Sequence, residues 1–217
     1  MKILSIETTT GICGIAYHDN NQLIAIVEEE LYREHSEKLP LFFESLRDQT
    51  EIDLGKLDGI AVSIGPGSFT GLRVGLSYAK GLAFSSNLPL VPVPTLQSLA
   101  EGANCEGKIR VMVKSHKDMI YFQDFTLIKD EVNPERANIE KWEIIKPSLN
   151  LFDKIVQYGC EEFLVESPEV KKVVNIKPSA KLIGETASKY YDRFKLTDFY
   201  QLEPEYITQL KIQRPVK

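Results

Sequence analysis

The glycine-rich segment in the middle of the first half of the chain most constrains what this sequence can fold into. Residues 59–64 read as a short apolar strand, residues 65–71 (Gly-Pro-Gly-Ser-Phe-Thr-Gly) as a turn, and residues 72–84 as a helix. A strand that passes through a glycine loop into a helix start is typical of α/β proteins, in which ligands sit at strand ends and helix starts. The sequence therefore predicts the α/β class.

Two interpretations of this loop remain open. Backbone N–H groups and the helix dipole at such a turn could hold a phosphate, or the glycines could serve only a tight turn. A Walker loop requires a lysine directly after its last glycine, and no lysine follows Gly71. The spacing of Gly65, Gly67 and Gly71 also differs from the dinucleotide-binding pattern Gly-x-Gly-x-x-Gly. We favour the structural turn.

The helix after the loop carries a stripe of small residues. Gly71, Gly75, Ala79 and Ala83 recur at every fourth position and would let another element approach closely. Glycine inside a helix costs about 1 kcal/mol relative to alanine, so a packing reason is expected. The stripe indicates either close packing within this chain or a helix-to-helix interface with a partner.

The remaining pattern predicts two α/β halves. The first opens with a meander of strands (2–7, 13–17, 23–27), followed by a helix capped by Ser36 with Pro40 in its first turn, and later by a strand (90–93) and a helix capped by Thr95. The second half predicts a hairpin (108–113 with 120–125), a helix (149–158), a strand (162–165) and a helix (179–194). We expect subdomains at 1–102 and 103–197, with the tail 198–217 returning to the first.

Composition excludes several classes of protein. The chain has 217 residues, 26 Lys and Arg against 31 Asp and Glu, and a net charge of −5, which disfavours a direct grip on nucleic acid. No apolar run approaches the roughly 18 residues of a membrane span. Three scattered cysteines indicate neither disulfides nor a zinc site. We expect a cytoplasmic protein with no membrane contact.

One stretch departs from the acidic average. Residues 169–195 contain seven basic and three acidic side chains, with Tyr190, Tyr191 and Phe194 nearby. This composition fits an RNA-facing patch or a solvated helix face in which Glu185 and Lys189 pair. We favour the solvated face.

Three blocks in the first hundred residues resemble one family. They are Ile-Leu-Ser-Ile-Glu-Thr-Thr at 3–9, Arg-Glu-His-Ser-Glu-Lys-Leu at 33–39, and the loop and helix at 65–75 with Ala-Lys-Gly-Leu-Ala at 79–83. In order and spacing they resemble the TsaB family, also called YeaZ. The resemblance implies an actin, Hsp70 and sugar-kinase (ASKHA) fold and a role in making threonylcarbamoyladenosine next to the anticodon of tRNAs that read ANN codons.

The resemblance also implies partners. It casts the chain as a non-catalytic subunit that pairs with and activates the TsaD paralogue, with the ATPase TsaE docking on the pair. Without TsaD, the same face is expected to form a homodimer, and tRNA is reached only through the complex. The partner interface is expected at His35, Ser36, Glu37, Gly71, Arg73, Gly75, Ala79 and Ala83.

No catalytic or metal site is expected. His18, His35 and His116 lack the spacing of a metal-binding pair, and no cofactor is expected beyond weak or vestigial nucleotide binding. Two alternatives remain: an actin-like ATPase or phosphotransferase, and, less supported, a peptidase. The expected vestigial nucleotide site consists of Glu7, Thr8, Thr9, Gly65 and Gly67.

Overall fold

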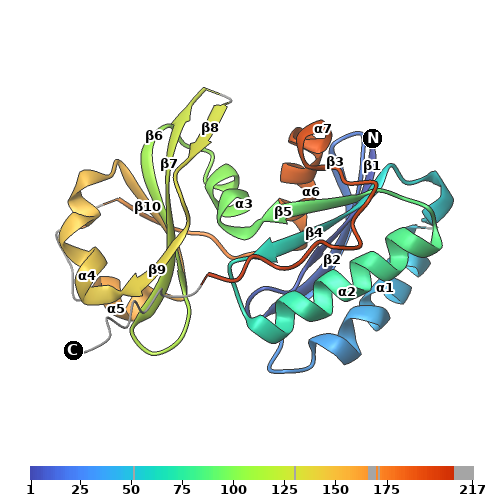
Figure 1. Cartoon of the computed structure of the whole chain (residues 1–217), viewed down its shortest axis with the longest axis horizontal. Coiled ribbons are helices and arrows are strands. Elements are labelled where there is room, and N and C mark those ends of the chain that lie inside the picture. The colour runs from blue at the N-terminus through green and yellow to red at the C-terminus, as the bar shows by residue number, and fades with distance from the viewer. Residues whose placement is uncertain (51, 130, 166–169, 171, 208–217) are drawn as a thin grey trace, which may run out of the picture.

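The computed structural model describes residues 1–207 except 51, 130, 166–169 and 171. The chain forms two lobes side by side, each built on one sheet, with the short helix α3 (Thr95–Gly102) lying between them (Figure 1). The predicted α/β class is confirmed.

The first lobe contains a five-stranded sheet in the order β3-β2-β1-β4-β5. The predicted meander forms its antiparallel part, and β4 and β5 join β1 in parallel through helical crossovers. The elements of this lobe before α3 are β1 (Lys2–Glu7), β2 (Ile12–Asp19), β3 (Gln22–Glu30), α1 (His35–Thr50), the 3-10 helix η1 (Leu54–Lys56), β4 (Gly59–Gly65), α2 (Phe69–Ser85) and β5 (Leu90–Pro94).

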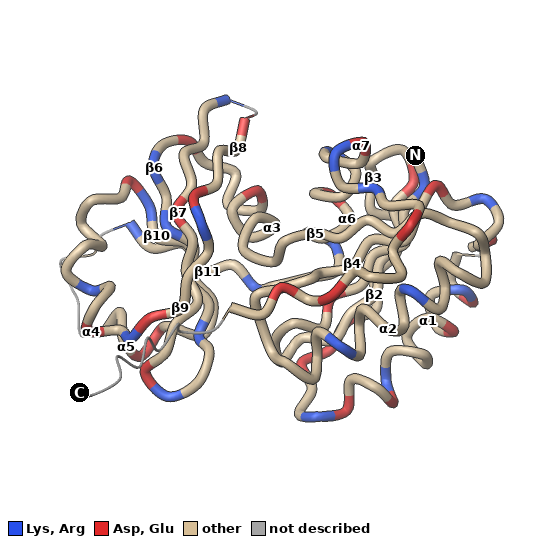
Figure 2. Tube along the Cα trace, viewed as in Figure 1, with Lys and Arg blue, Asp and Glu red and all other residues tan. Residues whose placement is uncertain are grey.

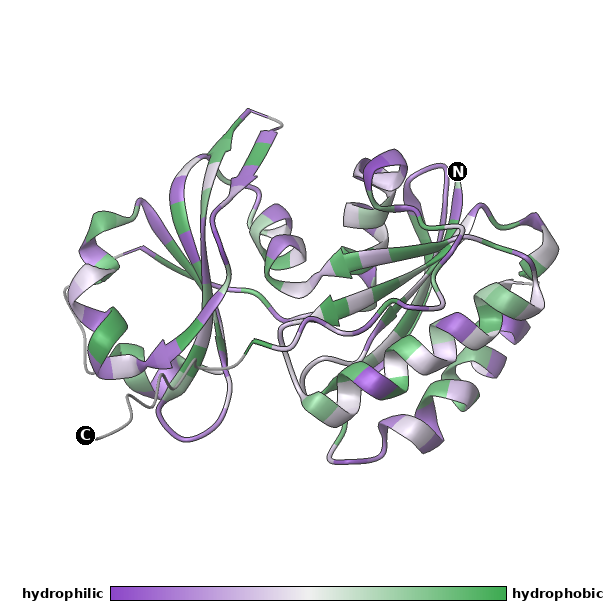
Figure 3. Ribbon diagram, viewed as in Figure 1, coloured by the Kyte–Doolittle hydropathy of each residue, from purple (hydrophilic) through white to green (hydrophobic). Residues whose placement is uncertain are grey.

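Both faces of this sheet are covered, which explains the uninterrupted apolar character of its central strands. In β1, Leu4 and Ile6 belong to the core cluster beneath α1 and α2, while Ile3 belongs to a cluster on the opposite face. That opposite face packs against α6 (Ala180–Lys189). Figure 3 shows hydrophobic residues concentrated along the central strands.

The second lobe contains a six-stranded sheet in the order β11-β10-β6-β7-β8, with β9 paired to β7. The predicted hairpin is present as two long antiparallel strands. Its elements are β6 (Gly107–Lys114), β7 (Met119–Ile128), β8 (Glu131–Pro134), β9 (Asn138–Lys141), α4 (Trp142–Ile145), the 3-10 helix η2 (Lys146–Leu151), β10 (Lys154–Tyr158), α5 (Glu161–Val165) and β11 (Val173–Asn175).

Two predictions for this lobe were wrong. The expected helix at 149–158 is instead the end of η2 followed by strand β10, because Ile155 and Val156 lie buried between β6 and β11. The expected strand at 162–165 is helix α5. Its two glutamates stand in the first turn, where negative charge favours a helix start.

The cap assignments also differ. Helix α1 begins at His35, so Ser36 lies inside its first turn, and Pro40 lies farther along the helix. Helix α3 begins at Thr95 after Pro94, and the buried Thr95 hydroxyl makes no hydrogen bond in the described part of the chain. Neither Ser36 nor Thr95 acts as the predicted cap.

The C-terminal part of the chain returns to the first lobe earlier than expected. Although it lies within the expected second subdomain, α6 packs against β1 and β2, and α7 (Tyr191–Phe194) packs near β5. Leu196 then pairs with Leu90, and the Lys80 ammonium donates hydrogen bonds to the carbonyls of Tyr200 and Leu202. The described part of the tail therefore lies along α2, and the rest lies outside the described residues.

Within the described residues, no helix combines the length and the apolar character needed to cross a membrane.

Candidate functional site

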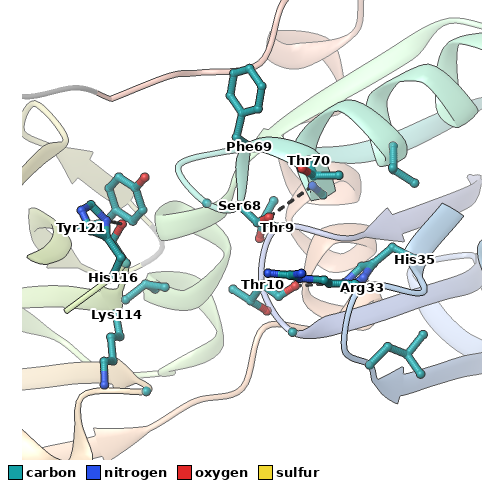
Figure 4. A pocket seen from close by; sticks show the side chains of 18 of the residues that line it. Thr9, Thr10, Arg33, His35, Ser68, Phe69, Thr70, Lys114, His116 and Tyr121 are labelled. Atoms are coloured by element: carbon teal, nitrogen blue, oxygen red, sulfur yellow. Dashed lines mark hydrogen bonds between the residues drawn. The ribbon is translucent and has the colours of Figure 1, made fainter.

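A cavity of about 830 Å³ opens between the two lobes. Five loops or element ends line it: the turn after β1, the segment from β3 to α1, the start of α2, the end and turn of the β6–β7 hairpin, and the end of β10. Figure 4 shows Tyr121 and His116 on one side of the gap, across from Thr10, Arg33 and Ser68 on the other. The cavity is therefore assembled from segments far apart in the sequence.

The glycine loop packs tightly against the turn after β1. The backbone N–H of Ser68 donates to the Thr9 carbonyl at 2.6 Å, and the Thr8 hydroxyl donates to the Gly71 carbonyl at 2.8 Å. A Cβ atom on Gly67 would lie 2.3 Å from the Thr9 carbonyl oxygen. The glycines thus allow two backbone segments to touch, as the favoured structural interpretation requires.

Gly65 has a further reason to lack a side chain. Its backbone has a positive φ of 117°, and a Cβ atom there would lie 2.8 Å from the carbonyl oxygen of Glu205 in the returning tail. Gly65 does not line the cavity between the lobes, whereas Gly67 does. The loop is therefore a junction of three chain segments.

Glu7 is buried beneath the cavity rather than directed into it. One carboxylate oxygen accepts hydrogen bonds from the backbone N–H and the hydroxyl of Thr9, both at 2.5 Å. The other oxygen has no hydrogen-bond partner among the described residues. Burial raises the pKa of Glu7 to about 7, although the bonds from Thr9 act in the opposite direction. Of the expected nucleotide-site residues, only Thr9 and Gly67 line the cavity.

The small-residue stripe of α2 faces inward. Gly71, Gly75, Ala79 and Ala83 are all buried, and a Cβ atom on Gly75 would lie 2.2 Å from the Thr8 hydroxyl oxygen. The prediction that these four residues touch a partner is wrong, because the sheet and the Thr8 turn of this chain already cover them. These four residues instead pack closely within the chain, which is the other interpretation that the sequence left open.

The remaining expected interface residues lie elsewhere. His35 and Ser36 line the cavity, and the His35 ring nitrogen Nε2 lies 3.0 Å from the Thr10 carbonyl. Arg73 is exposed on α2 and donates from Nε to the hydroxyl of Tyr206 in the tail at 2.9 Å. Glu37 is exposed on the first turn of α1. The structure therefore divides this set between two surfaces.

The side of α2 opposite the stripe is open. Among the described residues, no atom beyond the helix's own neighbouring backbone lies within 4 Å of a Cβ atom built on Gly81, and Ser77 one turn earlier is exposed. On the neighbouring helix α1, Leu41 is 54% exposed although it is apolar. We call this surface the outer helix face; its exposed members are Glu37, Leu41, Glu44 and Asp48 of α1 and Arg73, Ser77 and Gly81 of α2.

Most of the cavity lining was missed at the sequence level. Arg33, Lys114 and Tyr121 stand in segments that the sequence assigns to different lobes, so nothing in their local pattern marks them as neighbours. The available signal was general: ligands in α/β folds sit where strands end. Among the described residues, no group of three or more His, Cys, Asp or Glu side chains is placed to hold a metal ion.

The basic stretch at 169–195 is largely paired where the structure describes it. Lys181 pairs with Glu185, and Lys189 pairs with Glu101 at 2.8 Å, so the predicted pairing of Glu185 with Lys189 was wrong. Lys195 pairs with Asp192. Figure 2 shows basic and acidic residues interspersed along α6 and α7, which supports a solvated face. Residues 169 and 171 lie outside the described residues.

Comparison with known proteins identifies the family of this chain. A family model described as "TsaD: tRNA N6-adenosine threonylcarbamoyltransferase" matches residues 16–191, more than half of the chain. The Escherichia coli protein named tRNA threonylcarbamoyladenosine biosynthesis protein TsaB is 30% identical over 128 residues. The chain belongs to the family that this model describes and, within it, to the TsaB/YeaZ group. That sequence match covers 58% of this chain and 55% of the E. coli protein, so the chain spans about half the length of this relative.

Solved structures show the same fold. The structure titled YeaZ from Pseudomonas aeruginosa superposes with a TM-score of 0.77 at 21% identity, covering 95% of this chain and 99% of that one. The activator of the 2-hydroxyisocaproyl-CoA dehydratase from Clostridium difficile superposes with a TM-score of 0.54 at 9% identity, covering 88% and 95% of the two chains. The predicted TsaB/YeaZ resemblance and the ASKHA fold are confirmed.

Proposed function

We propose that this chain is a non-catalytic subunit of the machinery that makes threonylcarbamoyladenosine on the adenosine next to the anticodon of tRNAs that read ANN codons. The observation that carries the proposal is the set of TsaB relatives, which are named as biosynthesis proteins of that nucleoside. The chain pairs with the TsaD paralogue and activates it, TsaE docks on the pair, and the modification takes place in the cytoplasm.

The outer helix face is the surface we assign to TsaD. It combines an exposed apolar side chain, Leu41, with small residues at Ser77 and Gly81 that let a partner helix approach closely. Without TsaD, two copies of the chain bind each other through the same face. TsaD activation then follows because the pair favours the active arrangement of TsaD.

A single substitution tests this surface without disturbing the chain. Gly81→Gln places a bulky side chain where the structure leaves open space, so the isolated chain stays folded while pairing with TsaD weakens. Gly55→Gln is the matched control, because Gly55 is also exposed and lies in η1 outside the outer helix face. Size-exclusion chromatography with purified TsaD measures pairing, and circular dichroism checks the fold. Undiminished pairing of the Gly81→Gln variant contradicts the assigned surface.

Reconstitution tests the subunit role itself. Mixtures of the chain, TsaD, TsaE, ATP and tRNA are assayed for the modified nucleoside, using threonylcarbamoyl-adenylate as the acyl donor. We expect product only when TsaD is present, and more product when this chain is added. Product formed by the chain without TsaD overturns the proposal.

The alternative of an actin-like ATPase has less support. Its proposed carboxylate, Glu7, is buried and engaged with Thr9, and its proposed loop glycine, Gly65, lies against the tail. A metal ion that binds phosphates is held by carboxylates that reach it. Glu7 is buried, and one of its oxygens is bonded to Thr9, so it is not directed toward a ligand in the cavity. Ser115 and His116 line the cavity with Oγ and Nδ1 3.1 Å apart, but no described Asp or Glu lines it to orient that histidine, so the peptidase alternative also has less support.

A further inference from the structure

Four aromatic side chains lie along the side of α2 that contacts the returning tail. Phe69 and Phe84 belong to α2, and Tyr206 and Tyr200 belong to the tail. Phe69 packs against Tyr206 with ring centroids 5.0 Å apart, and Phe84 packs against Tyr200 at 6.3 Å. We call these four residues the aromatic flank. It consists of one ring pair at each end of α2, about 22 Å apart along the helix axis.

The aromatic flank remains largely exposed although its rings touch. The exposed fraction is 54% for Phe69, 67% for Phe84, 65% for Tyr200 and 38% for Tyr206. Since an aromatic side chain offers about 150–250 Å² for burial, the four rings leave roughly 450 Å² in contact with water. Most of their apolar surface is therefore free to be buried by another protein.

Polar contacts with the first lobe hold the tail in this position. The Lys80 ammonium donates to the carbonyls of Tyr200 and Leu202, and the Glu205 N–H donates to the Ile64 carbonyl at 2.7 Å. Figure 1 shows the tail extended across the first lobe beside α2. Because backbone atoms of the tail make these contacts, its tyrosine side chains remain available to a partner.

The aromatic flank adjoins the outer helix face. The Arg73 guanidinium, a member of that face, lies 3.8 Å from the centroid of the Phe69 ring and donates from Nε to the Tyr206 hydroxyl. At the other end of the helix, Phe84 follows Gly81 by three positions and so lies beside it on the helix surface. The two surfaces are therefore continuous along α2, and the tail orients Arg73.

The outer helix face needs such an extension to hold a partner. Leu41 is its large apolar side chain, and its other members are small or charged. A stable interface removes about 800 Å² of surface from each partner, and aromatic residues are enriched at its centre. The aromatic flank supplies roughly 450 Å² toward that area, with an aromatic pair at each end of α2.

Charge distinguishes between two occupants of this surface. Helix α1 contributes Glu37, Glu44 and Asp48, and none of these carboxylates makes an ion pair with another described residue. Two copies of the chain bring these like charges toward each other, whereas a partner with Lys or Arg opposite α1 forms ion pairs. The charges therefore favour a different protein with a basic docking surface over a second copy.

We propose that the aromatic flank is part of the surface that binds TsaD. Its two ring pairs enter apolar pockets of TsaD, and lysine or arginine side chains of TsaD face α1. This inference rests on the proposed pairing with TsaD, and it adds the tail to the surface assigned above. The tail then acts as a third docking element beside α1 and α2.

Calorimetric titration of TsaD with variants of the full chain tests the inference. Phe84→Ser and Tyr200→Ser are each expected to weaken the affinity at least tenfold, whereas Tyr200→Phe keeps the ring and stays within about twofold of the wild type. Ile144→Ser is the matched control, because Ile144 is also 65% exposed but lies on α4 of the second lobe. Urea unfolding checks that each isolated variant keeps the stability of the wild type. Because Phe84 lies on the helix, its variant tests the surface even if Tyr200→Ser loosens the tail.

The outcomes separate this inference from the pairing itself. If Phe84→Ser and Tyr200→Ser bind TsaD as tightly as Ile144→Ser does, the role of the aromatic flank is refuted. If Gly81→Gln still weakens pairing in that case, the pairing with TsaD stands. If the wild-type chain does not bind TsaD, both proposals fall. Sedimentation of each variant alone measures self-association, and a loss of self-association with unchanged affinity for TsaD shows that a second copy occupies the flank and overturns the inference.

Salt tests the charge argument. Exposed ion pairs are screened as ionic strength rises, so an increase in NaCl from about 50 to about 500 mM is expected to weaken the affinity of the wild-type chain for TsaD. Glu44→Gln should reduce this dependence on salt. An affinity that does not fall with salt contradicts a basic docking surface on TsaD.

Discussion

Replacing Gly71 with alanine gives a sharp test of how α2 is oriented. A Cβ atom at Gly71 would lie 2.0 Å from the carbonyl oxygen of Thr8. Because that oxygen belongs to the backbone, it cannot rotate away, and the hydrogen bond from Ser68 to Thr9 holds the same turn in place. Overpacking costs about 1–3 kcal/mol, and a backbone contact this short belongs at the upper end.

The expected loss of unfolding free energy is therefore about 3 kcal/mol, which lowers Tm by roughly 6–12 °C for a chain of this size. Gly81→Ala is the matched control on the same helix, since a Cβ atom there meets no other described residue within 4 Å. Better helix propensity should stabilise that variant by up to about 1 kcal/mol.

Urea unfolding followed by circular dichroism measures both variants, with the m-value checked for a change in the unfolded state. The reasoning is refuted if Gly71→Ala is as stable as the wild type, or if the two variants change stability equally. Either outcome means that α2 does not present its small-residue stripe to the Thr8 turn.

Three further predictions concern buried titratable groups and the tail. Burial raises the pKa of Glu7 from 4.5 to about 7, so the free energy of unfolding falls as the pH rises through that window. Glu7→Gln should remove this fall and be more stable than the wild type at pH 8 by up to about 3 kcal/mol, measured by urea titration. An unchanged dependence of stability on pH contradicts this. Burial lowers the pKa of His18 from 6.5 to about 4, and neither ring nitrogen has a partner among the described residues. Stability should therefore fall as the pH drops through that window, and His18→Leu should flatten the fall; a fall of unchanged size argues against it. Lys80→Met removes two hydrogen bonds to the carbonyls of Tyr200 and Leu202, so limited proteolysis should cleave the tail faster than in the wild type, and equal cleavage rates count against an anchoring role.

The sequence predicted the first lobe well because its signals are local. Short apolar runs and the glycine loop each report on a few neighbouring residues, and the strands and helices of this lobe lie where these signals predict them. The errors arose where tertiary packing decides the outcome. Ile155 and Val156 were expected in a helix, yet both are β-branched and lie in a strand between β6 and β11.

The candidate site was less predictable for a physical reason. Periodicity showed that α2 has a small-residue face but could not show whether the sheet or a partner covers it. The cavity depends on how the lobes face each other, so Arg33 and Lys114, 81 positions apart in the sequence, became neighbours of one cavity only in the folded chain. Glu7 was expected in a vestigial nucleotide site, but its burial and its bonds to Thr9 were not visible from sequence.

The placement of α6 has a consequence for how this chain is made. The face of the first sheet that carries Ile3, Ala61 and Val91 is covered by Ile183 and Ala187, which are synthesised long after the strands themselves. On the ribosome, the first sheet therefore stays bare on one side until α6 (Ala180–Lys189) has emerged. A fragment ending near residue 102 retains that bare face, so it is expected to aggregate or to recruit a chaperone, and the two lobes mature together rather than one after the other.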